Sequence, residues 1–395
     1  MRSLHALRLV EMTKEGGRDE KMDKEGLFVE LMQVALGARG ALSECPSEKE
    51  WRELFRVCQM QAVAAFAFPA LDRLSRAGQK APVGLVFEWL ALSEQVKAQN
   101  ELMNQEAARL TKLFEDAGHR TAILKGQANA RLYPDKMSRQ PGDIDIWVSG
   151  GKEKVIETAR QLGLLKGNIA KYSFDGDTTV SRHHIHLSKN EHGIDVEVHF
   201  LPSSGNINPF TNRRLLAFLE EEIHQENELV REGFRVPSLA FALVMQLAHI
   251  QRHLVSEGVG MRQMIDYYFL LKSDPNGQRG DVVDGLKRFG LQHTAEALMW
   301  VLHEKLGLEE DLLIAPRDER RGQMLWQQMM DGGNFGRYHP DKQHGLGRRI
   351  LAKHQHRLRM FRFDFSEAFW IELMYVSFFI KTIPDRIKRG RLSLE

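Results

Sequence analysis

The sequence predicts an α+β fold, in which a small mixed β-sheet core is flanked by N-terminal and C-terminal helical units. Short runs that alternate apolar and polar residues gather between residues 119 and 205 and are typical of strands. Elsewhere apolar residues recur at helical spacing. We therefore expect a flexible tail over 1–24, a helical unit over 25–118, an α/β core over 119–205 and a second helical unit over 206–395.

The N-terminal unit is predicted from helical periodicity that follows a charged start. Residues 1–24 are rich in Lys, Glu, Asp and Gly, so they bury too little apolar surface to offset the entropy of ordering. Helices are expected over 26–36 and 48–76, the second beginning after Pro46 and Ser47. A long helical pattern then covers 83–116 and leads into the first strand.

The core is predicted to contain five strands and two helices. Strands are expected over 119–124, 143–148, about 170–174, 182–188 and 193–200, and helices over 127–133 and 151–163. The polar segment 190–193 suits a hairpin between the last two strands.

The C-terminal unit is predicted to be helical. Helices are expected over 211–226, 237–256, 259–272, 281–306, 318–330, 343–360 and 366–386. Gly332 and Gly333 follow a helix rather than a strand, so we expect a helix C-cap and turn there and not a nucleotide loop. The longest apolar stretch contains Glu367, Glu372 and Lys381, which favours a buried or oligomeric helix over a membrane span.

Composition narrows the classes of partner and compartment. The chain has 55 basic and 53 acidic residues, a formal charge of +2, which argues against a long nucleic acid as the partner. The two cysteines, Cys45 and Cys58, cannot build a zinc site or a disulfide framework. No export signal is recognisable, so we expect a cytoplasmic protein.

Two predicted strands carry carboxylates on one face. Side chains alternate along a strand, so Asp143 and Asp145 share a face, and Asp195, Glu197 and His199 share a face on the second strand. Neighbouring carboxylates repel unless a cation lies between them. We therefore expect Asp143, Asp145 and a third acid, Glu197 or Asp195, to hold Mg²⁺ or Mn²⁺; the alternative is a solvated strand face.

A strand-to-helix turn precedes the acidic strands. Gly126 in this turn lets backbone amides approach a phosphate, and a following helix adds a favourable dipole. Lys125 and Arg139 lie near the expected cation site in the sequence, so we expect both to contact a triphosphate. The alternative for each is an ordinary salt bridge.

Two groups of histidines are candidates for substrate contacts. His184 shares a strand face with His186, next to His183, but the sequence supplies no further ligand for zinc, so we expect substrate contact or simple exposure. His249 and His253 are four residues apart on one helix face and lack the glutamate of a zincin motif. We expect this pair to line the cleft, with the charged form favoured by the carboxylates.

Several short motifs together resemble a known family. Leu124-Lys125-Gly126, Leu132-Tyr133-Pro134, Arg139 and Asp143-Ile144-Asp145 are similar to an uncharacterised bacterial nucleotidyltransferase family with the signature LKG…LYP…R…DID. This family lies within the DNA-polymerase-β-type nucleotidyltransferase superfamily. The later element Glu197-Val198-His199-Phe200 is similar too, as, more weakly, are the segments around His249, His253, Arg262 and Asp266.

The resemblance implies a reaction and roles for these residues. It implies Mg²⁺-dependent transfer of a nucleoside monophosphate from an NTP to an acceptor hydroxyl, whose identity the sequence does not give. Asp143, Asp145 and Glu197 would be the catalytic metal ligands, with Glu197 favoured over Asp195. Lys125, Gly126 and Arg139 would bind the nucleotide.

One departure from the superfamily supports an alternative. The superfamily has Gly-Ser or Gly-Gly at the turn, whereas this chain has Gly126-Gln127. The alternative is a nucleotide-binding or regulatory module of the same fold with impaired catalysis. Arg262 and Asp266 are four residues apart on a predicted helix, and we interpret them as a helical ion pair, worth roughly a few tenths of a kcal/mol if exposed.

Overall fold

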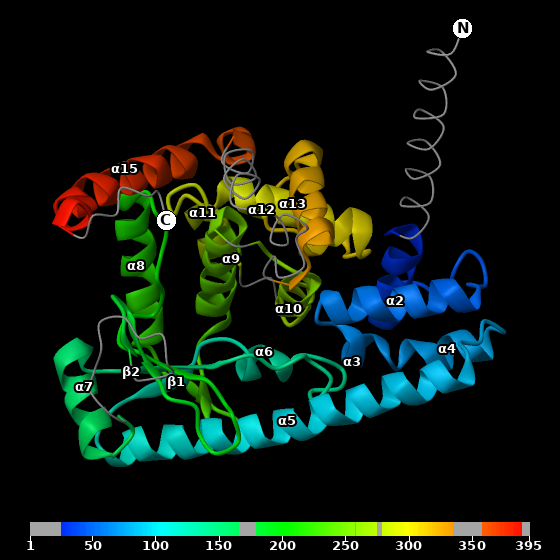
Figure 1. Ribbon diagram of the computed structural model, residues 1–395, viewed down its shortest axis with the longest axis horizontal. Helices are drawn as coiled ribbons and strands as arrows, with labels where there is room; N and C mark the ends of the chain where they lie inside the picture. The colour runs from blue at the N-terminus through cyan, green and yellow to red at the C-terminus, as the bar shows by residue number, and fades with distance from the viewer. Residues whose placement is uncertain (1–24, 166–178, 257, 275–278, 335–357, 389–395) are drawn as a thin grey trace, which may run out of the picture.

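The structure, a computed structural model, describes residues 25–165, 179–256, 258–274, 279–334 and 358–388 (Figure 1). It has the predicted α+β architecture, with one small mixed sheet flanked by helices. The expected tail over 1–24, the expected strand near 170–174 and most of the expected helix over 343–360 lie outside the described residues.

The N-terminal unit is a group of helices packed along one long helix. A helix over 25–36 is followed by α2 (Glu48–Met60), α3 (Ala64–Ala67), α4 (Ala70–Arg76) and α5 (Val83–Asp116). The start of α2 is as expected, because Ser47 and Glu50 form a reciprocal capping box. The bounds of α5 also match the prediction.

The single helix expected over 48–76 is wrong, because the chain breaks after α2. Ala62 has a φ of 57°, which a helix cannot accommodate. The neighbouring Gln61 is buried; its side chain donates to the carbonyl of Met329 at 2.9 Å and accepts from the amide of Met261 at 3.0 Å. Contacts with α10 (Met261–Lys272) and α13 (Glu319–Gly332), which lie far away in the sequence, therefore stabilise the break. Local periodicity cannot predict such contacts.

The sheet has the strand order β1-β2-β5-β4-β3. Its strands are β1 (Thr121–Ile123), β2 (Ile144–Val148), β3 (Thr179–Val180), β4 (His184–Leu187) and β5 (Val196–His199), with helices α6 (Gln127–Ala130) and α7 (Gly151–Gln161) between them. β2 is antiparallel to β1 and parallel to β5, while β4 is antiparallel to both β5 and β3. The expected hairpin between the last two strands is therefore confirmed.

One sheet face is apolar and the other bears the acids. Ile144, Ile146 and the alternate residues of β5 pack in a buried cluster with Phe114 of α5 and Val155 of α7. Asp145 lies on the opposite side of the same strand, as the alternation predicts. In Figure 1 the C-terminal half of α5 lies along one side of the sheet, with the C-terminal helices on the other. The apolar face thus packs against α5 and α7, and the acidic face is turned toward the C-terminal helices.

The C-terminal unit is mainly helical, with one short hairpin that the sequence analysis did not predict. Its elements are α8 (Pro209–Ile223), β6 (Glu228–Leu229), β7 (Arg235–Val236), α9 (Leu239–Ser256), α10 (Met261–Lys272), α11 (Gly280–Gly285), α12 (Gln292–Trp300), a π-helical turn (Val301–Lys305), a 3-10 turn (Glu310–Leu312), α13 (Glu319–Gly332) and α15 (Phe365–Lys388). α13 ends at Gly333, which has a φ of 61°, so the expected helix C-cap is confirmed.

The continuous helix expected over 281–306 is wrong. The chain breaks between α11 and α12 at Gly290, whose φ is +71° and where an added Cβ would lie 2.8 Å from Thr211. The neighbouring carbonyl of Phe289 accepts from the Asn206 side chain at 2.6 Å. Contact with the segment around α8 therefore decides this break, and a glycine is required there.

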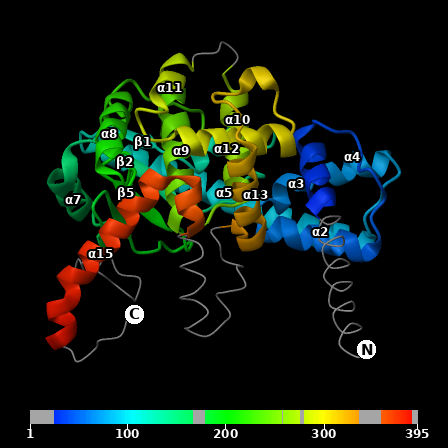
Figure 2. The ribbon, with the colours of Figure 1, turned by 90° about the horizontal axis from the view of Figure 1, so that it is seen from above.

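The last described helix, α15, projects beyond the rest of the described chain in Figure 2. One side of its first turn is buried: Glu367 is 3% exposed and accepts from the amide of Ile207 at 2.9 Å, whereas Phe365 is exposed. Further along, Phe369 and Tyr375 are about half exposed. Among the described residues, no helix combines the length and apolar character needed to cross a bilayer.

Candidate active site

A polar cleft of about 1310 Å³ opens at the acidic face of the sheet. Its wall is completed by α9, the N-terminal end of α10 and the break after α2. The charged and imidazole side chains that line it are Lys125, Asp143, Asp145, His183, His184, His186, Lys189, Asp195, Glu197, His199, His249, Arg252, His253 and Arg262. Most of the residues expected to serve the site therefore lie around one space.

The register of β2 and β5 places the acids. The strands are parallel, and Asp145 is paired directly with Glu197. Asp143 lies just before β2 and is more open: its side chain is 39% exposed, against 1% for Asp145. Donor atoms of Asp145, Glu197 and His199 all lie within 4.8 Å of one another. Asp195 lies just before β5, two residues from Glu197, and pairs with Lys189 at 3.1 Å, so the geometry favours Glu197 as the third acid.

Lys125 is a built-in counter-cation for the two aspartates. Its Nζ lies 3.1 Å from Asp145 Oδ2 and 3.7 Å from Asp143 Oδ2. Burial alone would lower the pKa of Lys125, but the charges of Asp143, Asp145 and Glu197 outweigh it and raise that pKa. In return, Lys125 lowers the pKa of Asp143. The lysine is thus charged and lies beside the oxygens that a divalent cation would use.

Gly126 is required by the backbone at the turn. Its φ is +62°, and an added Cβ would lie 3.4 Å from the carbonyl oxygen of Asp143. The positive φ disfavours any other residue here, while an added Cβ would make only ordinary contact with that oxygen. The helix expected over 127–133 is shorter than predicted, because α6 covers only Gln127–Ala130. Such a short helix supplies little dipole, so the favourable field expected for a phosphate is reduced.

His199 joins the two acidic strands, a role that the sequence analysis did not assign. Its Nε2 lies 3.0 Å from Asp145 Oδ1 and 3.3 Å from Glu197 Oε2. Burial alone would lower its pKa, but the hydrogen bonds to these carboxylates raise the pKa of His199 to about 9. Although burial opposes it, hydrogen bonding from His186 and His199 holds the pKa of Glu197 well below its ordinary value. The signal for His199 was its place on the acidic strand face.

The strand histidines lie opposite the acidic strand. In the antiparallel register of β4 and β5, His184 pairs with His199, and His186 pairs with Glu197. Burial lowers the pKa of His183 to about 3 and that of His184 to about 4. A hydrogen bond to Glu197 raises the pKa of His186. His183 and His184 are therefore neutral at neutral pH, and His184 lies in the cleft where substrate contact was expected.

His249 and His253 lie on the cleft wall formed by α9. Their ring centroids are 4.3 Å apart, in an edge-to-face arrangement. The expectation that carboxylates favour the charged form is wrong for His249, because burial, followed by the charge of Lys125, holds its pKa well below the ordinary value. A neutral imidazole offers a hydrogen bond rather than a charge to a substrate.

Arg139 is placed differently from the expected phosphate contact. Its guanidinium is buried, and it donates to both carboxylate oxygens of Asp266, at 2.7 and 2.8 Å. Tyr133 Oη donates to the same carboxylate at 2.7 Å. Arg139 does not line the cleft. Its contacts tie the segment before Asp143 to α10, so we assign it a positioning role.

Arg262 lies in the cleft instead. It donates to the carbonyl oxygens of Gln140 and Pro141, at 3.0 and 3.2 Å. Arg262 and Asp266 are 7% and 1% exposed, so the small contribution expected of an exposed helical pair does not apply to them. Both side chains instead hold the segment that enters β2.

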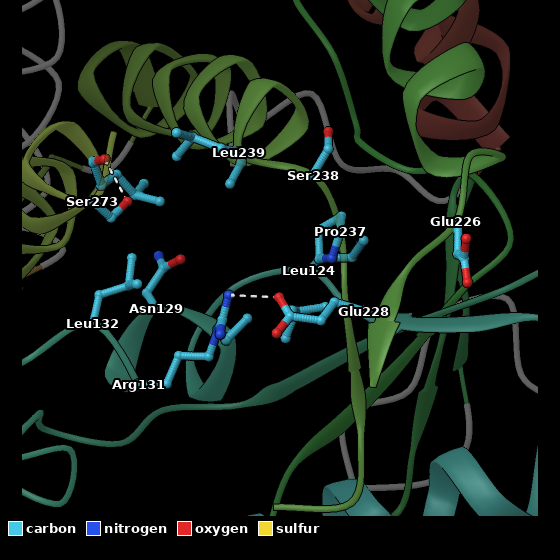
Figure 3. A pocket seen from close by; sticks show the side chains of 14 residues that line it. Leu124, Asn129, Arg131, Leu132, Glu226, Glu228, Pro237, Ser238, Leu239 and Ser273 are labelled. Carbon is cyan, nitrogen blue, oxygen red and sulfur yellow. Dashed lines mark hydrogen bonds and ion pairs between the residues drawn. The ribbon is translucent and has the colours of Figure 1, made fainter. Parts of the chain in front are cut away.

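A second pocket, of about 280 Å³, lies between the segment around α6 and the start of α9 (Figure 3). Leu124, Asn129 and Leu132 form one wall, and Leu239 of α9 faces them (Figure 3). Arg131 pairs with Glu228 across its edge at 3.6 Å (Figure 3). None of the expected site residues lines this pocket, so we place the candidate site in the larger cleft.

Comparison with known proteins identifies the family. The sequence matches the family described as "Uncharacterised nucleotidyltransferase" over residues 47–307, which is more than half of the chain. The chain belongs to this family. The resemblance seen in the sequence is therefore confirmed, and the match includes the whole sheet, the cleft acids, α9 and α10.

Individual relatives add little to the family match. No curated protein matches the chain. Among solved structures, it is similar to the crystal structure of an antigenic nucleotidyltransferase-like protein from Paracoccidioides brasiliensis, with 14% identity, a TM-score of 0.29, and coverage of 58% of this chain and 96% of that chain. A score this low supports no argument about the site.

Proposed function

We propose that this nucleotidyltransferase-family protein moves a nucleoside monophosphate from an NTP to an acceptor hydroxyl, with Mg²⁺ or Mn²⁺ as cofactor. One observation carries the proposal: the parallel register that pairs Asp145 with Glu197 on the cleft face, with Asp143 just before the same strand. Carboxylates arranged in this way suit a hard divalent cation. Membership of the family supports the reaction class.

The donor set fits such a cation. Asp143, Asp145 and Glu197 would hold it through carboxylate oxygens, the ligands that Mg²⁺ prefers. Asp145 Oδ2 is buried and has no hydrogen-bond partner among the described residues, although Lys125 Nζ compensates its charge across 3.1 Å. When bound, the cation would neutralise charge on the phosphate oxygens of the nucleotide. The same oxygens now face Lys125, so cation and lysine compete for them.

The basic side chains would bind the triphosphate. Once a cation satisfies Asp143 and Asp145, the Lys125 ammonium can turn toward a phosphate oxygen without leaving the cleft. Arg262 lines the same cleft and offers a planar donor to a phosphate. Gly126, with no side chain, leaves its backbone open to approach.

In the proposed transfer, one bond to the α-phosphorus forms and one breaks. The acceptor oxygen forms a bond to the α-phosphorus, and the bond from that phosphorus to the oxygen bridging to the β-phosphate breaks. Pyrophosphate leaves, and the hydroxyl proton passes to the Glu197 carboxylate, which lines the cleft. Apolar side chains at the cleft edge, among them Met60, Leu92 and Met245, would contact the acceptor. The near-neutral chain favours a small-molecule or protein hydroxyl over a long nucleic acid.

The proposal is tested with nucleotides and metal in turn. Each NTP is added with Mg²⁺ or Mn²⁺, and both protection against thermal unfolding and pyrophosphate release are measured. We expect at least one NTP to stabilise the protein only when metal is present, and Glu197→Gln to abolish this effect. Glu191→Gln is the matched control, because this glutamate is 86% exposed on the neighbouring turn. Failure of every nucleotide, or an unaffected Glu197→Gln, would contradict the proposal.

A nucleotide-binding module with impaired catalysis is the second candidate. It is favoured by His199, which hydrogen-bonds Asp145 and Glu197 and so engages two of the three proposed ligands. The Gly126-Gln127 turn also departs from the superfamily. Metal-dependent protection by an NTP without pyrophosphate release, over a panel of acceptors, is the result expected of this candidate.

A further inference from the structure

We propose that His183, His184 and His199 form a second, nitrogen-rich cation site that takes Zn²⁺ or a similar transition-metal ion. Each offers a ring nitrogen, and these three atoms lie within 4.8 Å of one another. The site adjoins the carboxylate group but is chemically distinct from it. Its existence does not depend on the proposed transfer reaction, because it is defined by binding of the metal alone.

Strand register and a local turn bring the three imidazoles together. The antiparallel pairing of β4 and β5 sets His184 opposite His199, with ring centroids 5.1 Å apart. His183 precedes β4, where Ser181 Oγ accepts the amide of His183 at 3.2 Å and that of His184 at 3.0 Å. This turn leaves the His183 ring 4.3 Å from His184 and 5.5 Å from His199, centroid to centroid.

A second observation points to a ligand. His199 is only 4% exposed, and its Nδ1 has no hydrogen-bond partner among the described residues. Buried polar atoms are normally satisfied, so such an atom calls for an explanation. The other ring nitrogen, Nε2, contacts Asp145 and Glu197. A metal ion on Nδ1 would complete the partners of this imidazole.

The ligand types select the metal. Imidazole nitrogen suits Zn²⁺, Cu²⁺, Ni²⁺ and similar ions, whereas Mg²⁺ takes oxygen ligands. Glu197 Oε2 lies 3.3 Å from both His184 Nδ1 and His199 Nε2, so it stays a hydrogen-bond acceptor beside the site, and water would be the fourth ligand of a tetrahedral ion. We therefore infer a three-imidazole set, with Glu197 beside it.

Occupancy of this site would act on the carboxylate site through His199. Metal-bound histidines commonly donate their other ring N–H to a carboxylate, which fixes the ring and its tautomer. Here that donor is Nε2, and its acceptors are Asp145 and Glu197. A transition-metal ion would thus hold His199 as a donor to both acidic strands.

The test uses the metal ion alone. Full-length protein is stripped with a chelator and titrated with Zn²⁺ and Co²⁺, and stoichiometry, calorimetric affinity and the visible spectrum of Co²⁺ are recorded. We expect one ion per chain and the intense absorption of tetrahedral Co²⁺. The double variant His183→Ala/His184→Ala should bind at least about tenfold more weakly, since even the hydrogen-bonding partner of a ligand is typically worth about 10–100-fold in affinity.

Three variants make the outcome decisive. His192→Ala is the matched control, because this histidine lies on the same hairpin and is 48% exposed; it should bind like wild type. Asp143→Asn should keep Zn²⁺ binding while losing metal-dependent nucleotide binding, which separates this inference from the proposed function. If the double variant does not fold, His183→Asn alone carries the test, because His183 precedes the strand. Absence of Zn²⁺ binding in wild type, or unchanged affinity in the histidine variants, would overturn the inference.

Discussion

Asp145 is the most buried of the cleft acids, and two cations compensate it. Lys125 contacts one of its oxygens at 3.1 Å and His199 the other at 3.0 Å. Burial and the charge of Asp143 nevertheless raise the pKa of Asp145, against the opposing effects of Lys125 and His199. The carboxylates of the site are therefore partly paired with Lys125 and His199 without a metal, and an incoming cation must rearrange these pairs.

Asp145→Asn should abolish nucleotide transfer and metal-dependent nucleotide affinity, because the amide is a poor substitute for a charged oxygen ligand. The chain should still fold, but with an unfolding free energy lower by on the order of 1–3 kcal/mol, since Lys125 and His199 lose a buried partner. Pyrophosphate release and urea unfolding measure the two effects. Wild-type turnover with a confirmed substrate would remove Asp145 from the mechanism.

Lys125→Met should tighten divalent-cation binding and weaken NTP binding. The methionine removes the ammonium that competes for Asp143 and Asp145, so a metal ion meets uncompensated oxygens, while a triphosphate loses a positive partner. Calorimetry with Mn²⁺ alone, and then with NTP, separates the effects. Lys189→Met is the control, because that lysine pairs with Asp195 and should leave Mn²⁺ affinity nearly unchanged. Weaker Mn²⁺ binding by Lys125→Met would refute the competition.

Stability of the metal-free protein should fall as the pH rises from about 6.5 to about 9. The pKa of His199 is about 9 in the fold against an ordinary 6.5, so its stabilisation is complete below 6.5 and is lost through 9. The expected loss is on the order of 1–3 kcal/mol. His183 and His184, with pKa values lowered to about 3 and about 4, act oppositely: their stabilisation is lost as the pH falls below 6.5.

Chemical unfolding at a series of pH values, with a chelator present, checks this profile. His199→Gln keeps a polar side chain but cannot titrate, so its unfolding free energy should lack the alkaline decline. An equally steep decline in the variant would assign it to another group.

The parallel pairing of β2 with β5 decides which acid meets Asp145. Glu197 is its partner in register, and Asp195 lies just before β5, beside Lys189. A one-residue shift would turn every acid to the apolar side, and the buried isoleucines of β2 oppose that shift. At the scale of elements, the apolar face thus sets the geometry of the charged face. The segment that leads into β2 is held by α10, through Asp266 and Arg262.

Arg139→Met should destabilise the fold strongly, by about 3–5 kcal/mol, because it leaves the buried Asp266 carboxylate without its bidentate partner. The double variant Arg139→Met/Asp266→Leu should recover much of this loss, since both charges are then removed. Urea unfolding of the single and double variants measures the coupling. Weaker NTP affinity in Arg139→Met with unchanged stability would instead restore Arg139 as a phosphate contact.

The long helix α5 links the parts of the molecule. Its beginning packs with α3, and its end packs beneath the sheet (Figure 1). Midway, Asn100 donates to the carbonyls of Met137 and Arg139, at 2.7 and 2.8 Å, and so holds the segment before the acidic strand. At the scale of the whole molecule, the cleft is bounded by the sheet and by both helical units. The domain boundaries at 118 and 205 stay a prediction.

The features that depend on local periodicity could be predicted from the sequence alone. Alternation placed Asp143 and Asp145 on one strand face, and Asp195, Glu197 and His199 on one face of a second strand, because side-chain direction in a strand follows from neighbouring residues alone. The same holds for the long helix over 83–116 and for Gly126, whose turn requires a positive φ.

Which of these residues meet depends instead on contacts between distant parts of the chain. The helix breaks at Gln61 and Gly290 depend on contacts with residues far away in the chain, so the local helical pattern did not predict them. Arg139 is buried against Asp266, 127 residues later, and sequence proximity to the acids suggested a phosphate contact instead. His199 illustrates the difference. Alternation placed it on the acidic face, but its contacts with Asp145 and His184 arise from pairing between strands. Pairing between distant segments is set by the packing of apolar faces, and the type of a residue does not specify which distant residue it contacts.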